Sequence, residues 1–400
     1  MKKMILLISV LSVFIVGCKE NKTDVLEVPI ITGAEQVDEY LPLLEGKTVG
    51  VMGNQTSIIG DQHLVDVLLE KGANLKFAFA PEHGFRGSVT GGVEINDEID
   101  EKTGLPIYSM YGEHAADSKN EKADSLVSSV DIMLFDLQDV GARFYTYITS
   151  LHQLMQLCAA NNTVLIVLDR PNPNGDQVDG PVRKSDEFKS DVSYHKIAMV
   201  HGLTVGELAQ MINGEGWLND GISCELHVIK VKNYTHNSRY ELPVVPSPSL
   251  PNHLAVRLYP SLCLFEATPV SVARGTDFPF QAVGYPNEAM GTFTFTPEPR
   301  EGMRSPLQSG NLCYGIDLRE LNADSIKFSL KYIVDFYQKS QGKFEFFSRS
   351  KRFDQLAGTA QLQEQLKAGL TEEQIRDSWS EELAEYKQMR KKYLLYDDFE

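Results

Sequence analysis

From residue 47 onward, short apolar runs alternate with stretches that have the apolar spacing of helices, and this alternation constrains the fold more than any other feature. A strand that is apolar along its whole length is buried on both faces, and a helix between two such strands provides the crossover that a parallel sheet needs. We therefore predict an α/β fold with an open, doubly wound, mostly parallel sheet. Strands are predicted at residues 48–53, 75–80, 106–110, 132–136, 163–168 and 224–231, and helices at residues 63–71, 121–129, 147–160 and 205–213.

The pattern changes in the last part of the chain. After a proline-rich passage, two short β-like runs at residues 292–296 and 314–318 are followed by helical patterns at 326–339 and 378–393. We predict a smaller α+β domain, which is joined to the α/β domain. The predicted domains are residues 35–286 for the α/β domain and residues 287–400 for the auxiliary domain.

The N-terminus has the layout of an export signal. Two lysines precede an apolar run that is shorter than the roughly 20 residues a membrane-spanning helix needs. Gly17 before Cys18 is similar to the cleavage site of bacterial lipoproteins, in which the cysteine becomes acylated. We predict a signal peptide at residues 1–17, lipidation of Cys18 and a tether at residues 18–34, with an uncleaved apolar helix as the alternative. The predicted location is the cell envelope, with a membrane anchor on the periplasmic side of the inner or outer membrane, or at the cell surface.

Composition excludes several classes of protein. Of 400 residues, 42% are hydrophobic and 23% are charged, which is typical of a globular chain rather than a disordered or fibrous one. The formal net charge of −17 argues against a nucleic-acid partner, because binding to phosphates requires a basic face. The cysteines after Cys18 lie in apolar surroundings without a C-x-x-C pair, so we predict buried thiols, with one disulfide as the alternative.

Motifs for several cofactors and reactions do not occur in the sequence. The first strand is followed by Asn54 and Gln55 rather than by G-x-G-x-x-G, and there is neither a Walker lysine loop nor H-E-x-x-H nor G-x-S-x-G. We therefore predict an activity that uses no cofactor and no metal.

Polar and ionisable residues follow the predicted strands, at the sheet edge where ligands bind in open parallel sheets. A single Asp or Asn at such a position can instead cap the next helix. His201 lies in a glycine-flanked loop, where we expect a role in the site, whereas His63, His152 and His227 lie within predicted elements and are expected to be structural or surface residues. The strand-end candidates are Asn54, Glu82, His83, Arg86, Asp136, Asp139, Arg143, Asp169, Arg170 and Asn172.

A cluster of carboxylates, amides and arginines suits the cleavage of a glycosidic bond. One protonated carboxyl donates to the leaving oxygen, while a second group stabilises the oxocarbenium-like centre or activates water. Glu82 is the candidate acid: burial beside Phe85 would raise its pKa, and His83 or Arg86 would lower it. Asp139 or Asp136 is the candidate second carboxylate, although Asp136 could also point into the sheet.

A second cluster lies downstream. The Arg-Gly-Thr-Asp turn at residues 274–277 combines a guanidinium with a hydroxyl and a carboxylate, a set suited to an anionic sugar. The alternative is a salt bridge between Arg274 and Asp277 that braces the turn. Glu266 is either a buried partner of an arginine or a third catalytic candidate.

At these motifs the chain resembles the NamZ family of exo-β-N-acetylmuramidases, over residues 35–396. The resemblance implies a Rossmann-like domain, a smaller auxiliary domain and an active site between them. It also implies release of N-acetylmuramic acid from the non-reducing ends of peptidoglycan fragments. The matching motifs are PEHGFRG (81–87), DLQDVGARFYTY (136–147), LDRPNPNG (168–175), HGLTVGEL (201–208) and CYGIDLR (313–319), together with residues 246–251 and 264–280.

The family resemblance also assigns roles to residues. It implies Glu82 as the catalytic acid, and it gives Arg274 or Arg143 a purpose, since the lactyl ether of the substrate carries a carboxylate. Alanines at 267 and 273 and Ser249 depart from the glycines and asparagine expected there. Two other functions stay open: a non-catalytic lipoprotein that binds muropeptides or sugars, and a phosphate-ester hydrolase. The cleft residues that the resemblance implies are His83, Arg86, Asp139, Arg143, Asp169, Arg170, Asn172, Glu266 and Arg274.

Overall fold

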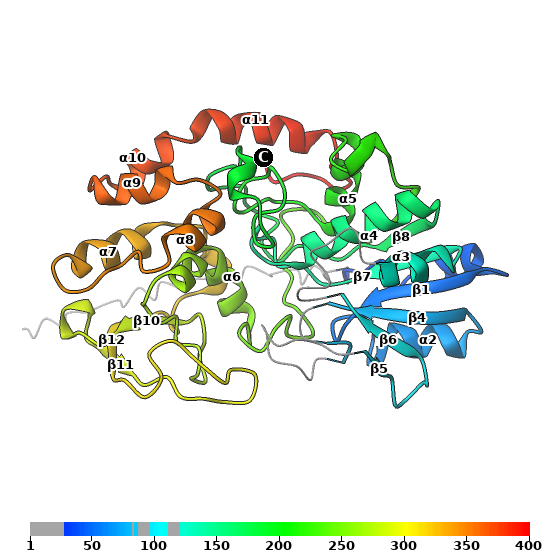
Figure 1. Cartoon of the computed structure of the whole chain (residues 1–400), viewed down its shortest axis with the longest axis horizontal. Coiled ribbons are helices and arrows are strands. Elements are labelled where there is room, and N and C mark those ends of the chain that lie inside the picture. The colour runs from blue at the N-terminus through cyan, green and yellow to red at the C-terminus, as the bar shows by residue number, and fades with distance from the viewer. Residues whose placement is uncertain (1–27, 82–83, 87–96, 111–120) are drawn as a thin grey trace, which may run out of the picture.

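The computed structural model describes residues 28–81, 84–86, 97–110 and 121–400. Figure 1 shows a sheet flanked by helices at one end and a more helical region with a small sheet at the other. The large sheet has seven strands in the order β5-β6-β4-β1-β7-β8-β9, and only β5 is antiparallel to its neighbour. The predicted doubly wound, mostly parallel sheet is confirmed. Its strands are β1 (Thr48–Gly53), β4 (Asn74–Ala80), β5 (Glu98–Ile99), β6 (Pro106–Ser109), β7 (Ile132–Asp136), β8 (Val164–Leu168) and β9 (Leu226–Ile229), and a separate hairpin pairs β2 (Ile58–Ile59) with β3 (Gln62–His63).

The order of the strands reverses next to β1. The chain runs from β1 outward to β4 and β6, and then returns to β7 on the other side of β1. In open parallel sheets, ligands bind beyond the carboxyl ends of the strands at such a reversal. The segments that follow β1 and β7 are therefore the ones that the topology places closest to a binding site.

Both faces of the sheet are covered, because its side chains alternate between two cores. Val49 and Val51 of β1 pack in one core with apolar residues of α2. Met133 and Phe135 of β7 pack in the other with α3, α4 and α5. In Figure 1, α2 accordingly lies on one side of the sheet, and the other three helices lie on the opposite side. The helices are α2 (Leu64–Glu70), α3 (Glu121–Ser128), α4 (Tyr147–Asn161) and α5 (Val205–Gly214), preceded by the short α1 (Val37–Tyr40).

Local sequence sets where these helices begin. At the start of α5, the Thr204 hydroxyl accepts from the backbone N–H of Glu207, and the Glu207 carboxylate accepts from the backbone N–H of Thr204. His63 begins α2, since its Nδ1 accepts from the backbone N–H of Val65 at 3.3 Å. The structural role predicted for His63 is confirmed.

The C-terminal region contains a three-stranded antiparallel sheet in the order β10-β12-β11. Gly315 of β12 lies so close to β10 that a Cβ atom there would stand 1.7 Å from the carbonyl oxygen of Val283. Because β10 precedes residue 287, this sheet extends across the domain boundary predicted there, and its pairing with β12 places β10 with the C-terminal region. The strands are β10 (Ala282–Tyr285), β11 (Phe293–Phe295) and β12 (Cys313–Asp317).

Six helices complete the described part of this region. The helix predicted from residue 326 begins only at residue 331, because the backbone N–H groups of Phe328 and Leu330 donate to the side chains of Gln177 and Glu372, at 2.7 and 2.8 Å. The helix predicted at 378–393 is confirmed as α11. The helices are α6 (His253–Leu262), α7 (Lys331–Ser340), α8 (Ser350–Ala357), α9 (Gln361–Lys367), α10 (Glu372–Asp377) and α11 (Ser380–Lys391).

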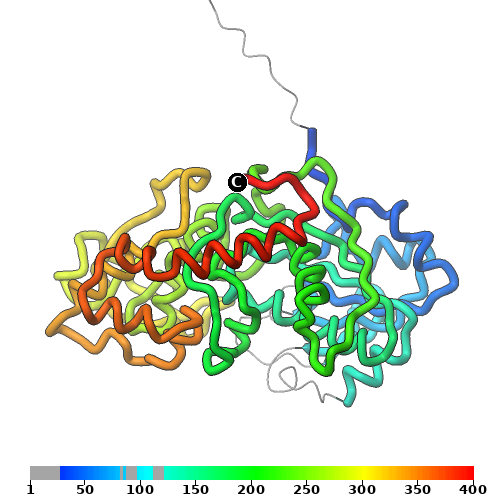
Figure 2. The backbone as a smooth tube through the Cα atoms, turned by 90° about the horizontal axis from the view of Figure 1, so that it is seen from above, coloured from blue at the N-terminus to red at the C-terminus, as the bar shows by residue number. Residues whose placement is uncertain are grey.

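Helix α11 joins the two regions. Figure 2 shows it as a red helix that runs along the molecule from the C-terminal helices toward the sheet. The Tyr386 hydroxyl donates to the carbonyl of His201 at 2.7 Å, and Arg390 Nε donates to the carbonyl of Gly202 at 2.9 Å. Across the described ranges, no helix combines the length and the apolar character needed to cross a bilayer.

Candidate active site

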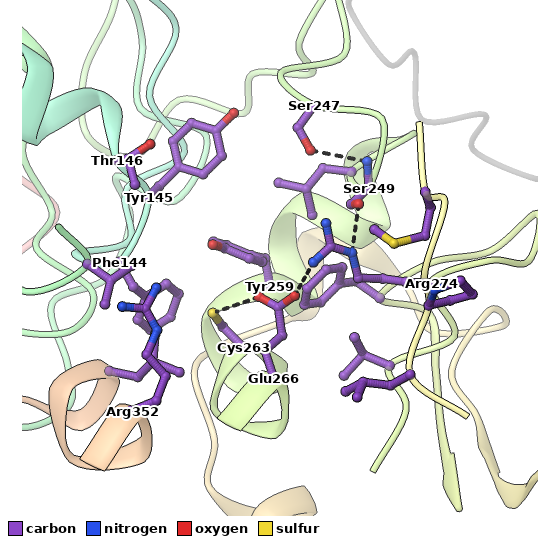
Figure 3. Close-up of a pocket in the computed structure, with 18 of the residues that line it drawn as sticks. Phe144, Tyr145, Thr146, Ser247, Ser249, Tyr259, Cys263, Glu266, Arg274 and Arg352 are labelled. Atoms are coloured by element: carbon purple, nitrogen blue, oxygen red, sulfur yellow. Dashed lines mark hydrogen bonds and ion pairs between the residues drawn. The ribbon is translucent and has the colours of Figure 1, made fainter. Parts of the chain in front are cut away.

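A cavity of about 410 Å³ lies between the sheet region and the C-terminal region. Figure 3 shows its wall of aromatic rings, with Phe144 and Tyr145 from the segment after β7 and Tyr259 from α6. Polar side chains line the same cavity, among them Ser247 and Ser249. A cavity with apolar walls and a few polar groups is typical of small-molecule and sugar sites.

The aromatic wall is connected to the edge of the large sheet. The Tyr145 hydroxyl donates to the carbonyl of Pro246 at 2.9 Å, and the Tyr147 hydroxyl donates to the same oxygen at 3.4 Å. Asn54, directly after β1, donates from Nδ2 to the Tyr147 hydroxyl at 2.7 Å. Asn54 is thus buried behind the wall and does not line the cavity.

Glu266 and Arg274 lie in the cavity and bind each other. Glu266 belongs to the 3₁₀ helix Cys263–Ala267, and its Oε1 forms a short ion pair with Nη1 of Arg274. Arg274 Nε also donates to the Ser249 hydroxyl at 3.0 Å, as Figure 3 shows. Burial by itself would lower the pKa of Arg274, but the Glu266 carboxylate raises it. The alternative that Arg274 pairs with Asp277 is wrong, because Asp277 forms its ion pair with Arg300.

Two further arginines line the cavity, at the beginning of α8. Arg352 pairs with Asp191 of the sheet region, with Nη1 to Oδ1 at 2.9 Å and Nη2 to Oδ2 at 3.4 Å. Arg349 is exposed, and its Nη2 donates to the backbone carbonyl of Glu266. These residues were missed because the sequence analysis predicted no helix at residues 350–357. The closely spaced basic residues Arg349, Lys351 and Arg352, in an acidic chain, are the signal that could have pointed to them.

Asp139 and His201 form a buried pair below the segment after β7. Asp139 Oδ2 accepts from the backbone N–H of Gly141 at 2.6 Å and lies 3.2 Å from His201 Nε2. The backbone N–H of Leu203 donates to His201 Nδ1 at 3.2 Å, so Nε2 carries the proton toward the carboxylate. Asp139 Oδ1 is buried and has no hydrogen-bond partner within the part of the chain that the structure describes.

The remaining strand-end carboxylates are held in the interior. Asp136 forms a two-pronged ion pair with Arg170, at 2.6 Å to Nε and 2.9 Å to Nη2. Its side chain therefore binds a buried arginine from the loop after β8 rather than a local partner. Asp169 accepts from Thr204, Gly206 and the Tyr396 hydroxyl, and burial nevertheless raises its pKa to about 6.

Arg143 and Asn172 also lie in the interior, although the family resemblance implied that they line the cleft. The guanidinium of Arg143 donates to the carbonyls of Pro181, Ile197 and Leu356 at 2.7 to 3.0 Å, and the side chain has no exposed surface. Asn172 donates to the carbonyl of Leu203 at 2.9 Å and accepts from a backbone N–H. Both side chains form hydrogen bonds with backbone groups of long loops. Most of these backbone groups are far away in the sequence, so the residues around the strand ends did not predict the interaction.

Arg86 binds two carboxylates outside the cavity. Its Nη2 lies 2.7 Å from Asp100 Oδ2 and 3.0 Å from Asp66 Oδ1, and it lowers the pKa of Asp100 to about 2. The other predicted residues of this motif, Glu82 and His83, lie outside the described residues, as does Cys18.

The predicted buried thiols are confirmed, since Cys158, Cys224, Cys263 and Cys313 are buried free cysteines. Burial raises the pKa of the Cys263 thiol, which lies 3.6 Å from Glu266 Oε2. Among the described residues, no three His, Cys, Asp or Glu side chains are grouped so that they could hold a metal ion.

Comparison with known proteins agrees with this arrangement. The N-terminal domain of the exo-β-N-acetylmuramidase NamZ matches residues 49–254, and its C-terminal domain matches residues 257–396. Over 379 residues, the chain is 35% identical to the peptidoglycan β-N-acetylmuramidase NamZ of Bacillus subtilis, covering 90% of this chain and 89% of that protein.

Two crystal structures have the same fold. A DUF1343 family protein from Bacteroides fragilis is 42% identical, with a TM-score of 0.84 and coverage of 93% of this chain and 100% of that one. A second protein of that family and organism is 27% identical, with a TM-score of 0.77 and coverage of 92% and 99%.

Fold, cavity and comparisons together define a two-region α/β glycoside hydrolase of peptidoglycan. The chain belongs to the NamZ family of exo-β-N-acetylmuramidases, whose two domain models together cover most of its length.

Proposed function

We propose that this protein hydrolyses the glycosidic bond of terminal N-acetylmuramic acid in peptidoglycan fragments, and that it releases this sugar from their non-reducing ends. The observation that carries the proposal is the cavity beside the segment that follows β7, with aromatic walls and three guanidiniums in a strongly acidic chain. Aromatic faces pack on the C–H surfaces of a sugar, and arginines bind its carboxylate.

Glu82 is the proposed general acid. The position of the PEHGFRG motif supports this assignment, because its first residue, Pro81, follows β4 directly and β4 pairs with β1 at the centre of the sheet. Gln55, two residues after β1, donates to the carbonyl of Pro246 at 3.2 Å, the same oxygen that Tyr145 of the cavity wall binds. The carboxyl ends of these two strands thus face the cavity side of the molecule.

Asp139 is the proposed second catalytic group. Its buried Oδ1, which has no hydrogen-bond partner among the described residues, supports a role in binding water or in positioning a neighbouring group, and His201 holds the other oxygen. Glu266 is the competing candidate, since it lines the cavity and is about a quarter exposed. Comparing the pH profiles of Asp139→Asn and Glu266→Gln distinguishes them, because only the catalytic carboxylate sets a limb of the profile.

A chromogenic β-N-acetylmuraminide tests the activity and the assignment of the acid. We expect turnover by the wild type, and we expect Glu82→Gln to lower kcat by about 10²- to 10⁴-fold, the usual contribution of general acid catalysis. Glu98→Gln is the matched control, because Glu98 is an exposed glutamate of the edge strand β5.

Two results would contradict parts of this proposal. Full turnover by Glu82→Gln would remove that residue from the role of the acid. Tight binding of the muraminide by the wild type without product release would instead identify a sugar-binding lipoprotein.

We also propose that the protein is a lipoprotein of the cell envelope, anchored through an acyl group on Cys18. The N-terminal sequence supports this, with basic residues, a short apolar run and Gly17 before the cysteine. We expect Cys18→Ala to move the protein from the membrane fraction to the soluble fraction and to remove the mass of the acyl chains, whereas Thr23→Ala in the tether changes neither. Retention of Cys18→Ala in the membrane would argue for an uncleaved apolar helix.

A further inference from the structure

The cavity carries more positive than negative charge among its described lining residues. Its guanidiniums belong to Arg274, Arg349 and Arg352, and its carboxylates to Asp191 and Glu266. One positive charge is therefore left over, in a chain whose formal net charge is −17. A local excess of positive charge in an acidic protein favours an anionic ligand at this position.

Two of the three guanidiniums already have carboxylate partners. Arg274 pairs with Glu266, and Arg352 makes two bonds to Asp191. An incoming carboxylate would have to compete with these internal partners, which reduces its net gain in free energy.

Arg349 differs from both. Its Nη2 donates to the backbone carbonyl of Glu266, and within the part of the chain that the structure describes it forms no ion pair. This bond uses one N–H of the five that a guanidinium can donate, and the side chain is exposed. Arg349 is therefore the charged group in the cavity that can accept a two-pronged carboxylate without losing an ionic partner.

The fold holds Arg349 in this place. It immediately precedes α8, and Arg352 and Leu356, which lie on the same face of that helix, also line the cavity. Its bond to Glu266 directs the guanidinium toward the 3₁₀ helix Cys263–Ala267, beside the ion pair of Glu266 with Arg274. Arg349 thus lines the cavity together with Glu266 and Arg274.

We propose that Arg349 is the specificity-determining residue that binds the lactyl carboxylate of N-acetylmuramic acid, and so distinguishes this sugar from N-acetylglucosamine. The inference rests on the proposed function, because it names the group that recognises the substrate of that site. Arg274, whose charge is compensated, positions Glu266 rather than binding the carboxylate.

Calorimetric titration with free N-acetylmuramic acid and with its lactyl methyl ester tests this role without requiring turnover. We expect Arg349→Gln to weaken binding of the free acid by about 10- to 100-fold, the range for a charged hydrogen-bonded pair. Binding of the ester is expected to stay unchanged, since it offers no negative charge. Arg349→Lys recovers part of the affinity for the acid, because it keeps the charge but not the two-pronged geometry.

The matched control is Arg239→Gln, an exposed arginine outside the cavity that pairs with Asp176. It is expected to bind both ligands as the wild type does. Equal losses for acid and ester in Arg349→Gln, or no loss for either, would overturn the proposal. Turnover of the chromogenic muraminide by the wild type is measured in a separate experiment. Loss of the proposed enzymatic function can therefore be distinguished from an incorrect role for Arg349.

Discussion

The carboxylates near the end of the sheet differ in what surrounds them, and this decides which of them can meet a substrate. Asp136 and Asp169 are fully buried and bound by several donors. Glu266 is also paired, but it is part of the cavity surface. The residue types and their order in the chain were sufficient to nominate all three, whereas their partners depend on segments far away in the sequence.

Two histidines in the interior make the stability of the protein depend on pH. His152 and His195 are buried, with Nδ1 of the first 3.1 Å from Nε2 of the second. Burial, with the charge of Lys189, lowers the pKa of His152 to about 4, and burial also lowers that of His195. The folded state therefore resists protonation, while the unfolded chain takes up protons below about pH 6.5.

We therefore expect the free energy of unfolding to fall as the pH decreases from about 6.5 toward 4. His152 alone contributes about 3 kcal/mol to this loss, since one pKa unit corresponds to about 1.4 kcal/mol. Urea unfolding at several pH values measures it, and the pH dependence of His152→Gln is expected to be shallower. His227→Gln, at an exposed position of β9, is the control. Parallel curves for His152→Gln and the wild type would contradict the prediction.

At the scale of secondary structure, the sheet was the most predictable part. Its strands β1 and β7 occupy the predicted residues. Short runs that are apolar along their whole length are typical of strands in a sheet that is covered on both faces, so they predict such strands reliably. Helix α8 was not predicted, although its spacing buries Phe353, Leu356 and Ala357. Its apolar face is short, and it becomes recognisable only against the 3₁₀ helix Cys263–Ala267, which it contacts.

At the scale of the whole molecule, Arg143 connects the two regions. Its guanidinium lies in the interior and donates to Pro181 and Ile197 of the sheet region and to Leu356 of α8. It thus supports the helix whose other residues, Arg349 and Arg352, line the cavity. A residue that the sequence nominated for substrate binding instead connects the sheet region to helix α8 beside the cavity.

Arg143→Met is expected to destabilise the protein by about 3 to 5 kcal/mol, because it leaves three buried carbonyls without their donor. We also expect lower affinity for the muraminide, since α8 loses an anchor beside the cavity. Chemical unfolding and calorimetry measure the two effects. Arg300→Met, at an exposed arginine, is expected to change stability by no more than about 0.5 kcal/mol. A variant at Arg143 as stable as the wild type would show that these hydrogen bonds contribute little.

The sequence by itself determined the mostly parallel sheet, the region of strand ends where polar residues gather and, through long motifs, the resemblance to the family. These features rest on local apolar patterns and on residue types, both of which can be seen along one chain. Tertiary structure alone decided that Arg143 and Asp169 are interior while Arg349 and Glu266 face the cavity. The physical reason is that a polar side chain becomes structural or available according to the backbone and charged groups that distant segments bring beside it.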